Sequence, residues 1–406
     1  MFIINPYFTV MISFMIAIAS FFFPAGVWEN IVNEENYMFL NYKMLFVFCF
    51  YILFLVLGIA FGKRCLRLKS ISLLSLFEIK GDGGFYVISF ISAALMIFYL
   101  AYNTILDHDF MFYTFRGETE IIKLEISKGN IDFATIPNYC VPFVMWCIFY
   151  CNIEPKRKIK IVTWMLISLF IFVSLVNSAR YLLVPFLVSV FVVYGYIYFK
   201  ENRKSPMYAF FYTSVFFLLV FFLFALISYM RDGGVVESLI GYIFASYNRL
   251  AAIVDGDLVY SGANFYNYFV PPKLLYYFSD FLGVNILSSH AVWELEFSSV
   301  AAAELNSKYI WPTQFGYAFG TTSYVGAGVF FLYGFICGYS WRSFKNKNLF
   351  GVIFYPLMYF SVLFSFGSFY FIIYFDYYFF SFIVLTGLMI FYNFFVLLNK
   401  MSKFSK

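Results

Sequence analysis

The chain has 406 residues, 63% of them hydrophobic and 12% charged, and a formal net charge of +5. Its apolar runs, such as residues 7–27 and 207–229, are too long for a soluble domain. A bilayer core of about 30 Å needs roughly 20 apolar residues per helix, so the composition predicts an all-α, polytopic membrane protein. The runs are continuous rather than alternating with period two, which disfavours a membrane β-barrel.

The apolar runs predict about ten membrane-spanning helices in one membrane domain, residues 1–406. The first run has no charged leader and no small-residue cleavage motif, so we expect a retained helix rather than a signal peptide. The polar stretch 230–316 is predicted to be one large outer loop that carries short interfacial helices. The predicted spans are residues 7–27, 38–61, 84–106, 134–153, 161–177, 181–199, 207–229, 317–340, 349–367 and 379–398.

Lysine and arginine gather in every second connecting segment, and this distribution predicts that both termini are cytoplasmic. The opposite loops carry most of the acids, in agreement with that orientation. The positive charge is then explained by topology and by attraction to anionic lipids, so it requires no nucleic-acid partner. The basic segments are residues 63–80, 156–160, 200–204, 342–347 and 400–406.

The predicted spans hold no ionisable residue near their middle, because Lys43 and Asp376 lie close to outer ends. Ion-coupled carriers place charged residues at mid-bilayer, and secondary transporters often show repeated halves with broken helices. The sequence has neither feature. We therefore expect binding or chemistry at the outer membrane boundary instead of a pathway through the bilayer.

The sequence predicts no disulfide, no metal site and no cofactor. All six cysteines fall within spans or on the predicted cytoplasmic side. Cys147 and Cys151 are one helical turn apart, but two ligands make a poor metal site and packing is the better interpretation. The Asp255-Gly256-Asp257 turn lacks the further oxygen ligands of a calcium site, which favours a solvated turn.

Three arginines on the predicted outer side are candidates for binding an anionic group. Arg180 lies in a short hairpin between the fifth and sixth spans, and Arg231 follows the seventh span. Arg249 lies in residues 237–254, whose apolar spacing predicts a helix in the plane of the membrane interface. A guanidinium binds phosphate oxygens bidentately and keeps its charge. The alternative is that these arginines snorkel to lipid phosphates or pair with acids such as Asp232.

A histidine and a carboxylate share one face of a second predicted helix, residues 290–306. His290 and Glu294 are four residues apart, the spacing at which a carboxylate orients an imidazole and raises its basicity. This pairing is typical of a general base. An exposed histidine without a role is the alternative, and the other histidine, His108, stands between two aspartates in a loop.

Glycines punctuate the chain from the end of the outer loop into the eighth span. Gly316 and Gly320, and again Gly334 and Gly338, are one turn apart, the spacing with which membrane helices approach closely. We interpret this run as a packing helix. Its outer end, residues 316–322, is also a candidate wall of a site.

Together these features resemble those of bacterial O-antigen and capsule repeat-unit polymerases of the Wzy type. This family is related in fold to the O-antigen ligases and to the wider GT-C membrane glycosyltransferases. The resemblance covers the topology of the whole chain, and its motifs are short. The pieces that carry it are Ser178-Ala179-Arg180-Tyr181-Leu182-Leu183, Met230-Arg231-Asp232, Asn248-Arg249-Leu250 and the Gly316–Gly338 run.

The resemblance implies a metal-independent glycosyl transfer at the periplasmic face of the bacterial inner membrane. A glycan on undecaprenyl pyrophosphate would move onto the terminal sugar of another lipid-linked repeat unit, and undecaprenyl pyrophosphate would leave. Such a transfer requires cations that stabilise the leaving pyrophosphate. By matching position, Arg180, Arg231 and Arg249 take that role. A chain-length regulator protein is a further partner implied by this class.

The resemblance also implies a base that takes the proton of the acceptor hydroxyl. In the ligases this role is associated with a histidine in the large loop, which implies His290 here. Asp232, Glu294 and Glu296 are the substitutes.

Other functions remain as alternatives. The related reaction of an O-antigen ligase is one of them. A flippase for the same lipid-linked sugars would need a polar cavity between pseudo-symmetric halves, which the charge-free spans disfavour. A membrane acyltransferase would need a histidine at the lipid interface, and neither histidine lies in a predicted span. A sensor without catalysis is the last alternative.

Overall fold

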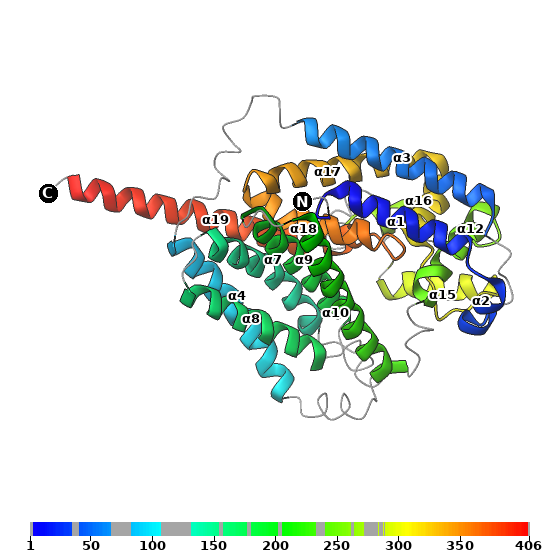
Figure 1. Ribbon diagram of the computed structural model, residues 1–406, viewed down its shortest axis with the longest axis horizontal. Helices are drawn as coiled ribbons and strands as arrows, with labels where there is room; N and C mark the ends of the chain where they lie inside the picture. Colours follow the sequence, from blue (N-terminus) through cyan, green and yellow to red (C-terminus); the bar gives the residue numbers. More distant parts are fainter. Residues whose placement is uncertain are drawn as a thin grey trace.

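Every element that the computed structural model describes is a helix (Figure 1). This confirms the predicted all-α class. The described residues are 3–34, 40–65, 83–106, 131–153, 157–176, 180–201, 205–232, 240–260, 264–271, 283, 287 and 289–404.

Five helical stretches are long and apolar enough to cross a membrane, and five more contain apolar stretches of 10–17 described residues. These positions coincide with the predicted spans, while the count of ten and the orientation stay predictions. The corresponding helices are α1 (Pro6–Phe21), α3 (Tyr42–Cys65), α4 (Gly83–Leu106), α7 (Ile131–Ile153), α8 (Arg157–Val176), α9 (Arg180–Glu201), α10 (Pro206–Asp232), α17 (Ala327–Lys345), α18 (Leu349–Leu363) and α19 (Tyr370–Phe404).

Short helices connect these long ones. Most of them come from the predicted large outer loop, whose helix at residues 290–306 is observed as α15. The short helices are α2 (Ala25–Val32), the π-helix η3 (Gly241–Ala245), α12 (Ser246–Asp255), α13 (Phe265–Phe269), α15 (Ser289–Ala302), α16 (Thr313–Thr322) and the 3-10 helix η4 (Ser323–Gly326).

Two predicted spans are interrupted. The first ends at Phe21 and continues as α2, because Pro24 has no N–H and disfavours helical conformation in the residue before it. The eighth breaks after α16 at Ser323, whose φ is 50°. The Ser323 carbonyl at this break accepts a hydrogen bond of 2.5 Å from the Tyr51 hydroxyl. The bond satisfies a polar group that the membrane interior would leave without water.

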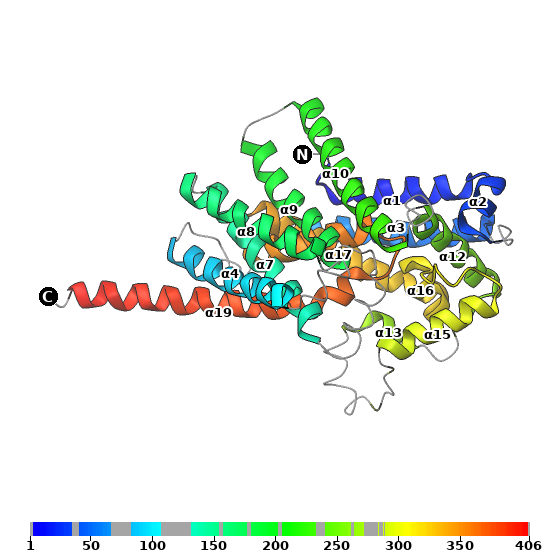
Figure 2. The ribbon, with the colours of Figure 1, turned by 90° about the horizontal axis from the view of Figure 1, so that it is seen from below.

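The last helix, α19, begins at Tyr370, earlier than the predicted start of the tenth span at 379. The side chain of Ser361 accepts a hydrogen bond of 2.9 Å from the N–H of Phe371. This N–H belongs to the first turn of α19, where backbone donors have no partner within the helix. The C-terminal part of α19 projects from the rest of the molecule in both views (Figures 1 and 2).

Helices α3 and α17 pack side by side with their backbones in contact (Figure 1). The predicted pair Gly334 and Gly338 lies on this interface, where a Cβ on Gly334 would lie 2.1 Å from the Leu55 carbonyl oxygen. The facing helix contributes its own pair, Gly58 and Gly62, which the sequence analysis did not single out. The glycines thus allow a helix contact closer than any side chain would permit.

Helix α18 forms the centre of the bundle, and nearly all of its residues are buried. It packs against α1, α9, α17 and α19. Its tyrosines also anchor the start of the chain, because the Tyr359 hydroxyl donates a 3.1 Å hydrogen bond to the Ile3 carbonyl and the Tyr355 hydroxyl donates to the Ile4 carbonyl. These carbonyls precede α1 and would otherwise be buried without a partner.

The short helices α2, α12 and α15 gather at the end of the molecule opposite the projecting part of α19 (Figures 1 and 2). Helix α12 also packs against α3 and α16. We call the assembly of α2, η3, α12, α13, α15 and α16 the outer cluster. Its helices come mainly from the two segments predicted to lie outside the membrane, so the predicted site residues are to be sought there.

The glycine contact between α3 and α17 can be tested by adding one methyl group. Gly334→Ala should destabilise the protein by about 1–3 kcal/mol, because the new Cβ overlaps the backbone of α3 and the helices must move apart. Gly387→Ala is the matched control, since a Cβ at Gly387 meets no atom within 4 Å. Thermal unfolding of the purified protein in detergent measures both. Equal stabilities of the two variants would contradict the backbone contact.

Candidate functional site

A buried ion pair lies at the centre of the outer cluster. Arg249, on α12, has no exposed side-chain surface, and its Nη2 donates to Oε1 of Glu34, which is equally buried. Its Nη1 donates to the Ala245 carbonyl at 3.0 Å, and its Nη2 donates also to the Asn306 carbonyl at 2.7 Å. The guanidinium is therefore held by one carboxylate and two backbone carbonyls.

The Glu34 carboxylate is held by amide groups as well. Asn248 Nδ2 donates to its Oε2 at 3.4 Å, and the Asn306 N–H donates to its Oε1 at 3.0 Å. The Asn306 side chain in turn donates to the Val32 carbonyl at 2.7 Å. A buried ion pair offsets the loss of hydration only when further hydrogen bonds of this kind complete it. The network joins α2, α12 and the segment after α15.

Arg249 thus lacks the accessible guanidinium that we expected at the lipid headgroup level. The predicted helix is observed as η3 and α12, and every residue from 246 to 253 is buried in protein, so this stretch has no apolar face exposed to lipid. The reason is that Glu34 supplies the counter-charge inside the protein. The guanidinium therefore needs neither water nor a lipid phosphate.

The other predicted site residues lie at helix ends. Arg180 is the first residue of α9, Arg231 and Asp232 close α10, and His290 is in the first turn of α15. Their side chains lie outside the part of the chain that the structure describes. Convergence of Arg180 with Arg231 therefore stays a prediction.

Helix α15 places two carboxylates on different faces. Glu294, one turn after His290, is exposed, whereas Glu296 is only 5% exposed. Glu296 falls between Val292 and Val300 at four-residue spacing, so it belongs to the inward stripe of the helix. Burial raises the pKa of Glu296 to about 7, and the nearby Tyr268 and Tyr317 side chains partly oppose this rise.

A cavity of about 230 Å³ lies next to the tyrosines that interact with Glu296, which is not itself a lining residue. Tyr268 and Tyr317 both line the cavity and interact with Glu296. Their rings stack with centroids 4.5 Å apart, and the Tyr260 and Tyr317 rings also stack, with centroids 6.1 Å apart. The remaining lining residues are Ile253, Leu258, Val259, Phe319, Gly320 and Thr321.

Two tyrosine hydroxyls of the cavity wall differ in their polar partners. The Tyr260 hydroxyl donates a 2.8 Å hydrogen bond to the Ile310 carbonyl, whereas the Tyr268 hydroxyl has no hydrogen bond of standard geometry within the described residues. Burial and the Glu296 carboxylate raise the pKa of Tyr268 far above its usual value, so its hydroxyl stays protonated. The interacting polar group of this hydroxyl is the Glu296 side chain.

The arrangement combines a proton-accepting carboxyl group with aromatic walls. A carboxyl group with a pKa near 7 is half ionised at neutral pH, which suits a general acid or base. The tyrosine rings and the Tyr268 hydroxyl can stack on a sugar and bond to it, in keeping with the Tyr-Asn-rich stretch at 264–268.

The glycines of α16 shape one wall of this cavity. Gly320 and Thr321 line it, as expected for residues 316–322, and a Cβ on Gly316 or Gly320 would lie within about 3.5 Å of the Ile253 side chain. Ile253 belongs to α12, and it lines the cavity too. The close packing of α16 on α12 therefore sets the width of the cavity.

The Asp255-Gly256-Asp257 turn is exposed at Gly256 and Asp257, in agreement with a solvated turn, and Asp255 also forms an ion pair. Lys43 Nζ lies 3.0 Å from Asp255 Oδ1, and the Asn41 side chain donates to the other carboxylate oxygen. Gly256 closes α12 with a φ of 92°, a conformation that favours glycine. No group of three potential metal ligands occurs among the residues that the structure describes.

The sequence matches no protein-family model, and comparisons with curated proteins and with solved structures found no significant similarity. The chemistry of the cavity therefore has to be argued from the residues of this chain.

The buried ion pair predicts strong coupling between its two members. Arg249→Met should destabilise the protein by about 3–5 kcal/mol, because Glu34 would stay charged in the interior without a partner. The double variant Glu34→Gln/Arg249→Met should lose less than Arg249→Met alone, since no buried charge is left. Thermal unfolding in detergent gives the stabilities of the four proteins in this double-mutant cycle. They are wild type, Glu34→Gln, Arg249→Met and the double variant.

The exposed pair of Lys43 with Asp255 is the control for this cycle. The Lys43 side chain is 75% exposed, so Lys43→Met should change the stability by no more than about 1 kcal/mol. Additive losses in the Glu34 and Arg249 variants would contradict a coupled pair.

Glu296→Gln should stabilise the protein at high pH only. Below pH 4.5, the ordinary pKa, the carboxyl group is neutral in the folded and the unfolded chain, so its burial carries no charge penalty. Above the folded pKa of about 7 the buried group is ionised, which costs the folded state about 3 kcal/mol at about 1.4 kcal/mol per pKa unit. Unfolding temperatures of wild type and variant should therefore agree at pH 4.5 and differ at pH 8. The exposed Glu294→Gln is the control, and an equal gain at both pH values would refute the buried acid.

Proposed function

We propose that this chain is a membrane glycosyltransferase that polymerises undecaprenyl-pyrophosphate-linked repeat units of a surface polysaccharide, an O-antigen or a capsule. The observation that carries the proposal is the tyrosine cavity beside Glu296 in the outer cluster. It combines a proton acceptor with aromatic surfaces for a sugar, on the side predicted to face the periplasm. The proposed location is the bacterial inner membrane, with the lipid-linked oligosaccharide and membrane lipids as partners.

In the proposed reaction the acceptor hydroxyl attacks the anomeric carbon of the donor sugar. A new C–O bond forms there as the bond from that carbon to the pyrophosphate oxygen breaks, and the leaving oxygen takes the electron pair. The acceptor proton moves to the Tyr268 oxygen while the Tyr268 proton moves to Glu296. The products are the lengthened glycan and undecaprenyl pyrophosphate.

In this scheme Glu296 is the final proton acceptor and does not bind the sugar. Its carboxylate interacts with Tyr268, which lines the cavity, so a proton can pass between them without reaching solvent. Tyr268 alone would be a poor base because its raised pKa keeps it protonated. In the pair, Tyr268 supplies the polar contact with the acceptor hydroxyl and Glu296 accepts the proton.

The leaving pyrophosphate requires fixed positive charge. Arg180 and Arg231 are proposed for this role because they stand at ends of α9 and α10 that the charge distribution predicts to be outer. Guanidinium groups bind phosphate oxygens in pairs and stabilise charge that develops as the bond breaks. Arg249 takes a different part in the proposal. Through Glu34 it fixes α12, which carries the cavity wall residue Ile253.

Glycan chain length tests the proposal directly. Cells that lack the gene should attach one repeat unit to the acceptor, and wild type should restore a ladder on gels. Glu296→Gln, Arg180→Ala and Arg231→Ala should each slow polymerisation by roughly 10² or more, because each removes a group used in the transition state. With purified protein the rate should rise with pH around pH 7, as Glu296 loses its proton, and Glu296→Gln should remove this dependence.

Variants on the other candidate bases decide which group takes the proton. His290→Ala, Glu294→Gln and Asp232→Asn should keep normal ladders if Glu296 has the role. Loss of the ladder in His290→Ala or Glu294→Gln, with Glu296→Gln active, would assign the base to His290 or Glu294 instead. Normal ladders in both arginine variants at normal expression would refute the pyrophosphate role. Absence of all surface glycan in the deletion, with lipid-linked units trapped inside, would indicate a flippase.

A further inference from the structure

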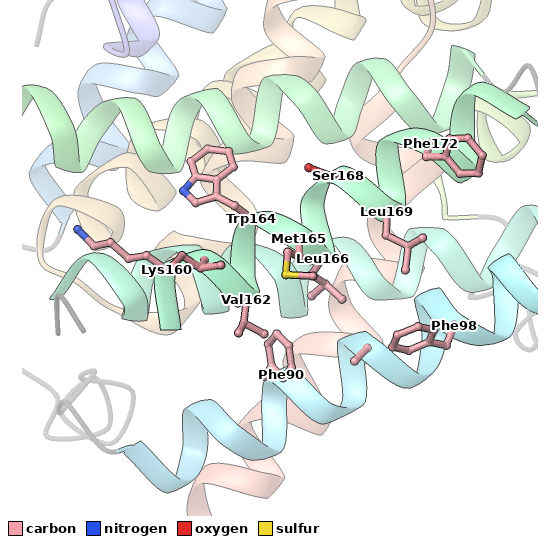
Figure 3. Close-up of a pocket in the computed structure, with 12 residues that line it drawn as sticks. Phe90, Phe98, Lys160, Val162, Trp164, Met165, Leu166, Ser168, Leu169 and Phe172 are labelled. Carbon is pink, nitrogen blue, oxygen red and sulfur yellow. The ribbon is translucent and has the colours of Figure 1, made fainter. Parts of the chain in front are cut away.

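A long apolar groove of about 1220 Å³ lies between α4 and α8 (Figure 3). Phe90 and Phe98 of α4 lie opposite Val162 and Leu169 of α8, and the only charged lining residue, Lys160, stands at one end of the groove. The other lining residues are Ala94, Ile161, Trp164, Met165, Leu166, Ser168 and Phe172.

The two helices run parallel, so the first turns of both helices lie at the basic end of the groove. The Tyr86 hydroxyl and Thr163 Oγ1 are 3.0 Å apart, which pairs the beginning of α4 with the beginning of α8. From Lys160 to Phe172 a helix rises about 18 Å, close to the roughly 15 Å of one leaflet of the hydrocarbon core. The groove therefore has the length of a single lipid chain.

The charge at its end points to an anionic headgroup. Residues 154–160 contain four basic residues and one acid, Glu154. Lys160 itself forms no ion pair with any residue that the structure describes. Trp164 stands one turn further along, and tryptophan is enriched at lipid interfaces. Basic sites between membrane helices on the cytoplasmic side are suited to anionic lipid headgroups.

We propose that the groove between α4 and α8 binds one anionic glycerophospholipid, with an acyl chain along the apolar walls and the headgroup phosphate on Lys160. The site lies between other helices than the tyrosine cavity and contains none of its residues. It is independent of the polymerase proposal. A zwitterionic lipid would fill the same walls but would bring its own positive charge next to Lys160.

Native mass spectrometry of the purified full-length protein tests the site. The protein is incubated with phosphatidylglycerol or with phosphatidylcholine of identical acyl chains. We expect wild type to retain one phosphatidylglycerol at least about fivefold more strongly, and Lys160→Gln to reduce this preference about fivefold, the effect of one cation near an anionic surface. Ala94→Trp, which fills the groove, should abolish retention of both lipids.

Matched variants outside the groove serve as controls. Lys308→Gln removes an exposed lysine from the outer cluster, and Leu219→Trp adds an indole to an exposed position of α10. Both should bind lipid like wild type. Equal retention of the two lipids by wild type, or an unchanged preference in Lys160→Gln, would overturn the proposal, and so would retention of phosphatidylglycerol by folded Ala94→Trp. Lys160→Gln keeps the test decisive if Ala94→Trp does not fold.

Discussion

The outer cluster depends on the buried ion pair between Glu34 and Arg249. An arginine does not lose its proton in a protein, so a guanidinium without water contact needs an anion beside it. That anion comes from a position 215 residues earlier in the chain. The pair thereby ties the segment after α2 to α12, and α12 carries Ile253 into the cavity wall. The geometry of the cavity thus rests on a contact made outside it.

The long helices could be predicted from the sequence because their cause is local. A continuous apolar run of about 20 residues has few stable forms in a membrane other than a helix. The interruptions were harder to predict. Pro24 is a recognisable signal for the end of α1, whereas the break at Ser323 depends on Tyr51 from another helix. The glycine spacing on α17 predicted a close helix contact. That α3 is the partner follows only from the structure.

The candidate site was predictable only in part, because its groups meet through tertiary contacts. The sequence identified α15 and its carboxylates, yet their faces depend on what the helix packs against. The spacing of Val292, Glu296 and Val300 was the available signal for an inward carboxylate. Nothing local to Arg249 indicated Glu34 as its partner. The tyrosines around the cavity stand out little in a chain with 36 of them, so composition alone did not single them out.

Glu296 is the residue whose position calls for a functional explanation. Leucine or glutamine at this place on α15 would pack against the same tyrosines without a charge, whereas the carboxylate destabilises the folded state above pH 7. The Glu34 carboxylate is buried too, but Arg249 and two further hydrogen-bond donors compensate it. Glu296 has two tyrosines and no cation as its neighbours of largest effect. An acid kept titratable near neutral pH beside a tyrosine hydroxyl is a poor structural element and a suitable proton acceptor. The proposed proton transfer is placed on that face of α15 for this reason.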